Sequence, residues 1–99
     1  MKLQVQWSES SIKDLGEIIE FVNENWGEKT ALDYLIHIEN IVEQIQVYPF
    51  VFPVINLELE IRKCVLSTHN SLYYRVNNSE IHILRIYSNV INPIKHKLK

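Results

Sequence analysis

The chain has 99 residues, 46% of them hydrophobic, with few Gly or Pro and a formal net charge of −2. This length supports one domain with a single core, and the apolar fraction excludes a disordered chain. The near-neutral charge excludes the global basic field typical of many nucleic-acid-binding proteins. We therefore expect one domain spanning residues 1–99.

Charge and cysteine content indicate the setting in which the protein works. Residues 9–60 are rich in Glu and Asp, whereas residues 61–99 carry seven Lys and Arg against the single acid Glu80. The lone Cys64 cannot form an internal disulfide, which predicts a reducing compartment. The N-terminal residues lack the apolar core of a signal peptide, and no apolar run reaches the ~20 residues of a membrane span. We expect a cytoplasmic protein.

Residues 2–7 predict a strand, because Leu3, Val5 and Trp7 alternate with polar residues. Ser8 is a favourable helix N-cap, and a helix is expected from there to about Trp26. Its apolar positions recur at three- and four-residue steps: Ile12, Leu15, Ile18, Ile19, Val22 and Trp26. Its acidic residues predict a solvated face: Glu9, Asp14, Glu17, Glu20 and Glu24. Gly16 predicts the close approach of another backbone.

Gly27 predicts the end of this helix, and a second helix is expected from residue 28 or 29 to about Tyr48. Its apolar positions also have helical spacing: Ala31, Leu32, Leu35, Ile38, Ile41, Val42 and Ile45. The two helices predict an antiparallel hairpin whose apolar face lies on a sheet. Pro49 and Pro53 then exclude a helix, and the apolar residues between them predict a segment packed over the edge of the core.

The remaining chain predicts antiparallel strands beginning at Leu57 or Leu59, with a turn over residues 67–70 and strands over 71–76 and 81–87. Asn77-Asn78 has the residue types of a tight hairpin. Apolar residues on both faces of 81–87 predict a central strand. The predicted fold class is α+β: a helical hairpin packed on a small, mostly antiparallel sheet, with the N-terminal strand at or near its centre.

Candidate functional residues gather in residues 60–93, which hold Arg62, Arg75, Arg85, Tyr73, Tyr74 and Tyr87. Structural roles are the alternative. Arg62 can pair with Glu58 or Glu60, and Arg75 and Arg85 can be cross-strand partners of each other's neighbours. The histidines lack the spacing of metal ligands, so we expect no metal and no cofactor.

The order strand, helix, helix and antiparallel meander resembles the RelE/ParE superfamily of toxins from type II toxin–antitoxin systems. The resemblance covers essentially the whole chain and has these carriers: Trp7-Ser8, Asp14-Leu15, the 31–45 helix ending in Tyr48-Pro49, Ile61-Arg62, Tyr73-Tyr74-Arg75-Val76, residues 81–86, and the closing IYSNVINP. In this order and at these spacings the motifs are typical of the superfamily.

The resemblance implies one of two activities. RelE-like members cleave mRNA in the ribosomal A site without a metal, using Lys and Arg and often a Tyr or His on the sheet. ParE-like members poison DNA gyrase. Both are neutralised by a small antitoxin, which we expect to add a helix or strand in an exposed groove or at a sheet edge. Plasmid stabilisation and growth inhibition are the roles implied.

Two departures favour the ParE branch. The cleaving branch usually has an arginine just before the hydrophobic-Tyr pair of the third strand, and this place falls on Ser71; the arginine that it has just past the last strand falls on Val90 or Ile91. RNA cleavage needs a base, an acid and cations around the phosphorane, so their loss leaves enzymatic activity open. Candidate catalytic residues are Arg62, Arg85 and Tyr87; together with Arg75, His69 and His96 they form the set from which a site could be assembled. Candidate target-binding residues are Arg62, Arg75, Arg85, Tyr87 and Lys95. The alternatives are a ribosome-dependent endoribonuclease and a non-toxic binding module.

Overall fold

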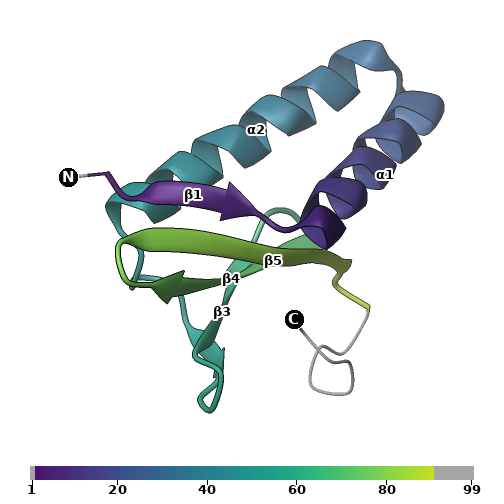
Figure 1. The fold of residues 1–99 in the computed structure, drawn as a ribbon. Helices are drawn as coiled ribbons and strands as arrows, with labels where there is room; N and C mark the ends of the chain where they lie inside the picture. The colour runs from purple at the N-terminus through teal and green to yellow at the C-terminus, as the bar shows by residue number, and fades with distance from the viewer. Residues whose placement is uncertain (1, 91–99) are drawn as a thin grey trace.

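The computed structural model describes residues 2–90, which form two helices and one five-stranded sheet (Figure 1). The elements follow one another as β1 (Gln4–Trp7), α1 (Glu9–Trp26), α2 (Glu28–Val47), β2 (Val54–Asn56), β3 (Ile61–Val65), β4 (Asn70–Asn77) and β5 (Glu80–Ser88). The predicted α+β architecture is confirmed. The candidates Lys95 and His96 lie outside the described residues.

The strands are ordered β1-β5-β4-β3-β2, and every pair is antiparallel except β1 with β5. The prediction that the N-terminal strand lies at or near the centre was wrong, because β1 is an edge strand. The meander places β4 beside both β3 and β5, so a strand arriving from before the helices finds an open place only at an outer edge (Figure 1). β5, with β1 and β4 as neighbours, is an inner strand as expected.

α1 begins where the sequence predicted. The Ser8 hydroxyl accepts a hydrogen bond from the Ser11 amide at 3.0 Å and donates one to the Leu84 carbonyl at 2.8 Å, so one side chain both caps α1 and fixes it to β5. Gly27, with φ of 96°, separates the two helices. A Cβ on Gly16 would meet nothing within 4 Å, so the predicted close approach at Gly16 was wrong.

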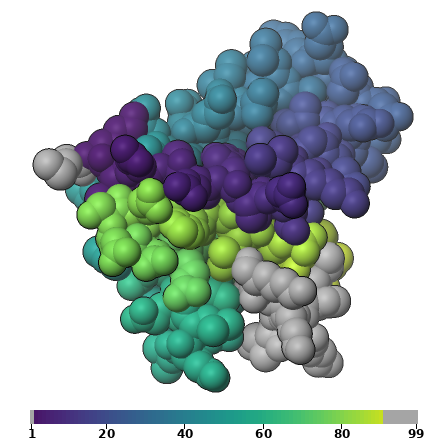
Figure 2. Space-filling view, in the orientation of Figure 1, coloured from purple at the N-terminus to yellow at the C-terminus, as the bar shows by residue number. Residues whose placement is uncertain are grey.

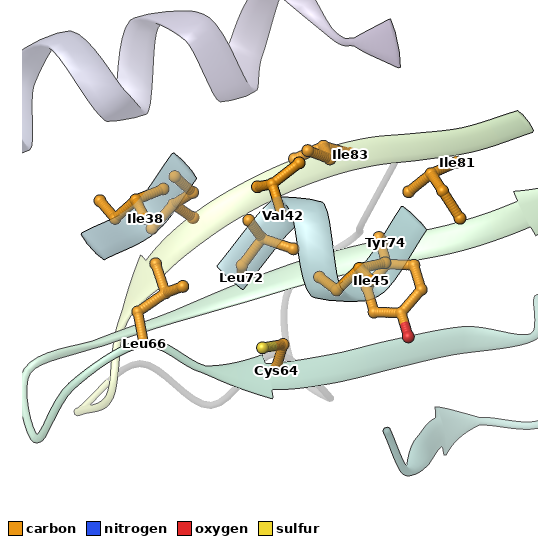
Figure 3. Close-up of a cluster of buried hydrophobic side chains, with 10 residues drawn as sticks. Ile38, Val42, Ile45, Cys64, Leu66, Leu72, Tyr74, Ile81 and Ile83 are labelled. Carbon is orange, nitrogen blue, oxygen red and sulfur yellow. The ribbon is translucent and has the colours of Figure 1, made fainter. Parts of the chain in front are cut away.

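The main core lies between α2 and one face of the sheet (Figure 3). Ile38, Val42 and Ile45 of α2 pack against Cys64, Leu72, Tyr74, Ile81 and Ile83 of the strands. Trp26 and Leu32 belong to the predicted apolar stripes but are exposed, because the hairpin extends past the sheet (Figure 1). Ile12, in the first turn of α1, is exposed as well. Asp14 was predicted to be solvated; it is instead buried, since it faces β5.

The segment between α2 and β3 differs most from expectation. Phe52 packs on the core, but Tyr48, Phe50 and Val51 are exposed, so the predicted packing over the core edge holds only in part. β2 was not predicted, because three residues after a proline give too short a pattern. The β4–β5 turn lies one residue further along than predicted: Asn77 pairs with Glu80, and Asn78 has a φ of 58°.

Candidate functional site

The candidate residues are divided between the two faces of the sheet. Directly paired residues in neighbouring strands share a face, and side chains alternate along each strand. Arg62 pairs with Tyr74, which is in the core beneath α2, so Arg62 lies at the margin of the helix-covered face. Arg85 pairs with Tyr73, and Arg75 and Tyr87 are on the same side, which is the face without helices (the open face). The structure therefore does not bring Arg62 together with the other candidates.

Arg62 binds backbone carbonyls rather than an acidic residue. Its Nη1 donates to the Phe52 carbonyl at 2.7 Å and to the Phe50 carbonyl at 3.1 Å, and its guanidinium lies 5.1 Å from the centre of the Phe50 ring. Within residues 2–90, neither Glu58 nor Glu60 forms an ion pair. Arg62 thus holds the loop that precedes β2.

Arg85 forms an ion pair with Asp14 of α1. Its Nε and Nη2 donate to the two carboxylate oxygens at 2.8 and 3.0 Å, and the Ile86 amide donates to Asp14 as well. The hydrogen bond to Asp14 is the main cause that raises the pKa of Arg85 above its usual value. The guanidinium also lies 4.8 Å from the centre of the Tyr87 ring, which in turn packs on Tyr73. Asp14 therefore positions Arg85 directly and Tyr87 through Arg85.

Arg75 lies on the open face beside a second polar group. It is paired across the strands with His82, whose Nε2 lies 3.1 Å from the carboxylate of Glu80. Lys63 occupies the same face on β3, opposite Tyr73. The Nε of Arg75 is buried without a hydrogen-bond partner in the described part of the chain. Arg75 and Lys63 give the open face a positive charge.

Ser71, where the cleaving branch usually has arginine, is fully buried, and its hydroxyl donates to the Asn89 side chain at 2.6 Å. The side-chain amide of Asn89 also donates to the Ser67 carbonyl, and its backbone amide donates to the His69 carbonyl. Tyr34 of α2 bonds the Ser67 hydroxyl, and burial raises the pKa of Tyr34. This network fixes the β3–β4 turn and leaves His69 exposed on it.

A groove runs between the two helices (the helical groove). Two hollows of about 350 and 500 Å³ form it, and Leu35 lines both. Trp7 closes one end, and three acidic residues, Glu20, Glu28 and Glu39, stand along it. The remaining lining is mostly apolar: Ile12, Leu15, Gly16, Ile19, Ala31, Leu32, Ile38 and Val42, with Asn23 as the polar exception.

Two further features bear on the kind of site. Among residues 2–90, no three His, Cys, Asp or Glu side chains gather in a way that could hold a metal ion. Neither α1 nor α2 is long and apolar enough to cross a membrane.

The model of the ParE toxin of type II toxin–antitoxin systems matches residues 5–90. The chain belongs to this family. The match covers all of the strands and helices described above except the first residue of β1, so the ParE family assignment rests on the whole fold. No curated protein matches the chain.

Solved structures of ParE and its relatives share this fold. A chain of the chromosomal ParDE system of P. aeruginosa is 25% identical, with a TM-score of 0.74 over 88% of this chain and 96% of its own. The RelBE2 toxin–antitoxin complex of Mycobacterium tuberculosis gives 16% identity and a TM-score of 0.63 over 90% and 100%. The YoeB/ParE toxin of Agrobacterium tumefaciens gives 14% and 0.65 over 88% and 99%. At these identities the last two show the fold alone.

Sequence reasoning missed Asp14 and Asn89 as partners of candidate positions. The signal for Asp14 was present, since it lies between Ser11 and Leu15 within the apolar stripe of the first helix, where a solvated acid is out of place. For Asn89 no signal existed, because its partner Ser71 becomes a neighbour only through the pairing of β4 with β5.

Proposed function

We propose that this ParE-family chain is a toxin that acts by binding a cellular target, with DNA gyrase as the leading candidate, and that it does not cleave RNA. The observation that carries the proposal is that the positions at which a nuclease would need free cations are either engaged in structural contacts or lack the arginine. Arg85 is bound by Asp14, Arg62 by backbone carbonyls, and Ser71 is buried.

Cleavage by a 2′-hydroxyl needs a base, an acid and cations that converge on one phosphate. Arg62 lies on the opposite side of the sheet from Arg85 and Tyr87, so these three candidates cannot contact one phosphate together. Burial raises the pKa of Tyr73, and the nearby Tyr87 raises it further, which makes Tyr73 a poor proton donor or base near neutral pH. These placements support target binding over catalysis.

The open face is the contact surface that we propose for the target. Lys63 and Arg75 make it positive, and Arg85 and Tyr87 stand beside them as a fixed pair. Lys95 remains a proposed contributor from the basic C-terminal region. A positive surface steers association with an acidic partner, and its effect weakens as salt is added.

The helical groove is the place that we propose for the cognate antitoxin. Its apolar lining and acidic residues fit an amphipathic helix that carries Lys or Arg beside its apolar stripe. Figure 2 shows the two helices in the upper part of the molecule and the strands of the meander below them. The helical groove lies between the helices, whereas the open face is the face of the sheet that the helices do not cover, so the two surfaces are separate. Antitoxin and target therefore have separate surfaces.

Induction of the chain alone in a bacterial host tests the proposal. We expect colony counts to fall steeply, with intact mRNA in the same cells, and the purified chain to inhibit supercoiling by gyrase. Arg75→Gln together with Lys63→Gln should restore growth while leaving the fold intact, since both side chains are only half-buried and Gln keeps their polarity without the charge. Cleaved mRNA would establish the nuclease instead, and normal growth with folded protein present would establish a non-toxic module.

The antitoxin site has a matched pair of variants. Leu32 lines the helical groove, whereas Phe21 is equally exposed on α1 but does not line it. With the antitoxin co-expressed, Leu32→Lys should restore growth inhibition and Phe21→Lys should not. If both variants remain neutralised, the antitoxin binds elsewhere.

A further inference from the structure

A surface at the β2 edge of the sheet, remote from the helical groove, exposes large apolar side chains on a fixed backbone. Phe50 and Val51 are 65% and 70% exposed, and Tyr48 is similarly open. We name residues 48–51 the aromatic loop. Monomers seldom expose contiguous apolar patches of this kind without an interaction partner.

The aromatic loop is held by contacts from three directions. Arg62 binds the Phe50 and Phe52 carbonyls, the Tyr74 hydroxyl donates to the Pro49 carbonyl at 2.7 Å, and the Lys63 amide donates to the Pro53 carbonyl at 3.0 Å. Side chains presented on a fixed loop lose little conformational freedom when they bind. The loop is therefore built for contact rather than left open by weak packing.

Arg62 has donors left for a partner. Its contacts to the loop use Nη1 alone, and within residues 2–90 its Nε and Nη2 have no hydrogen-bond partner. A guanidinium beside exposed aromatic side chains suits a carboxylate flanked by apolar groups, the combination that dominates many protein interfaces. The aromatic loop and Arg62 together therefore fit a partner segment in which acidic and apolar residues alternate.

The chain itself carries such a segment at the same edge. The turn between β2 and β3 (residues 57–60, the hairpin tip) reads Leu-Glu-Leu-Glu and projects from the sheet, teal at the lower end of Figure 1. Leu57 is 86% exposed, and both glutamates are exposed. Leu59 donates its amide to the Asn56 side chain, and Glu60 adopts a φ of 54°, so the tip also has a defined shape.

The hairpin tip cannot contact the aromatic loop of its own chain, because the two segments lie at opposite ends of β2. A second copy can. If two β2 strands lie antiparallel about Ile55, residues 57–60 of one copy stand opposite residues 50–53 of the other, and the arrangement is reciprocal. Glu58 or Glu60 then reaches Arg62 of the other copy, and Leu57 and Leu59 cover its Phe50 and Val51.

We propose that the chain forms a two-fold homodimer in which each hairpin tip docks on the aromatic loop of the other copy. Because β2 has three residues and follows Pro53, side chains rather than backbone hydrogen bonds carry the contact. An aromatic side chain can bury roughly 200 Å² of surface area in a contact. Tyr48 and Phe50 at two-thirds exposure therefore supply on the order of 250 Å² per copy, and the leucines and Val51 extend this toward the ~800 Å² per partner of a standard interface.

Sedimentation velocity of the chain made alone by cell-free translation tests the dimer, from about 1 to about 200 μM. The unmodified chain should pass from monomer to dimer within this range. Val51→Glu and Leu57→Ser should each weaken the dimer at least about tenfold. Phe21→Glu is the matched control, since Phe21 is 56% exposed but belongs to α1 rather than to this edge of the sheet, and it should leave the dimer unchanged.

Every outcome decides the proposal. A chain that stays monomeric throughout this range overturns it. A dimer that Val51→Glu and Leu57→Ser leave intact places the contact elsewhere and overturns it as well. Glu58→Arg together with Glu60→Arg, which keeps Arg62 on its own loop but places like charges opposite Arg62 of the other copy, should weaken the dimer as well; a dimer of unchanged affinity would overturn the reciprocal ion pair.

Discussion

Asp14 and Arg85, 71 residues apart in the sequence, form a two-point ion pair that ties α1 to β5. The Asp14 carboxylate also accepts the Ile86 amide, so one buried side chain meets three donors. Through the contact of Arg85 with Tyr87, this pair fixes the end of the open face. A residue expected to be solvated thus supports the proposed target surface.

Asp14→Asn should destabilise the chain by about 2 kcal/mol, because it leaves the Arg85 charge and the buried Ile86 amide poorly matched. The partial exposure of Arg85 keeps the loss below that of a fully buried pair. Urea unfolding measures the change. Glu24→Gln, on the exposed side of the same helix, should shift the midpoint little; an equal loss in both variants would show that the ion pair adds nothing specific.

Ser71→Arg, which places arginine where the cleaving branch has it, should unfold the chain rather than create a nuclease. Ser71 is fully buried and bonded to Asn89, so a guanidinium there is desolvated without a partner, at a cost of at least about 3 kcal/mol. Thermal unfolding compares it with Ser79→Arg in the exposed β4–β5 turn, which should be near neutral. A folded Ser71→Arg protein that cuts mRNA on ribosomes would contradict this account.

Local patterns in the sequence predicted the elements well. The alternation over residues 2–7, the Ser8 cap and the spacing of Ile38, Val42 and Ile45 each depend on neighbouring residues, and each is present in the structure. β2 escaped prediction because a three-residue strand after Pro53 has no readable period. Gly16 carried no packing information, since an exposed helical glycine has no contact to satisfy.

The candidate site could be predicted only as a set of residue types. Whether Arg62 shares a face with Arg85 depends on the register of β3, β4 and β5, including the irregularity at Tyr73 and Tyr74. The partner of Arg85 depends on how α1 crosses β5, and no local pattern encodes that crossing. The position of β1 at the edge is likewise set by a pairing with a strand more than 70 residues away.

Arg62→Ala should release the aromatic loop without unfolding the sheet. Two hydrogen bonds to carbonyls and the contact with Phe50 are lost, at about 1–2 kcal/mol. Chymotrypsin cleavage after Phe50 should become at least about tenfold faster; Tyr48 and Phe52 each precede a proline, which blocks cleavage after them. Lys63→Ala removes the neighbouring charge from the other face and should leave the cleavage rate unchanged. Equal rates in both variants would show that Arg62 does not hold the loop.

The core also predicts how stability depends on alkaline pH. Burial raises the pKa of Cys64 from 9.0 to about 11, and burial, partly offset by the charge of Arg62, raises the pKa of Tyr74 from 10.0 to about 12. Between the unfolded and folded pKa values the folded chain holds a proton that the unfolded chain has released. The stability from each group is therefore complete below its unfolded pKa and is lost as pH rises through its folded value.

The free energy of unfolding should accordingly decline above pH about 9, with Cys64 acting first and Tyr74 from about 10. Each group contributes at most about 3 kcal/mol, the equivalent of a two-unit pKa shift. Urea midpoints from pH about 8 to about 11 measure the decline, and Cys64→Ala should delay its onset by about one pH unit. If Cys64→Ala follows the unmodified chain across this range, the buried thiol is not the group that releases its proton on unfolding.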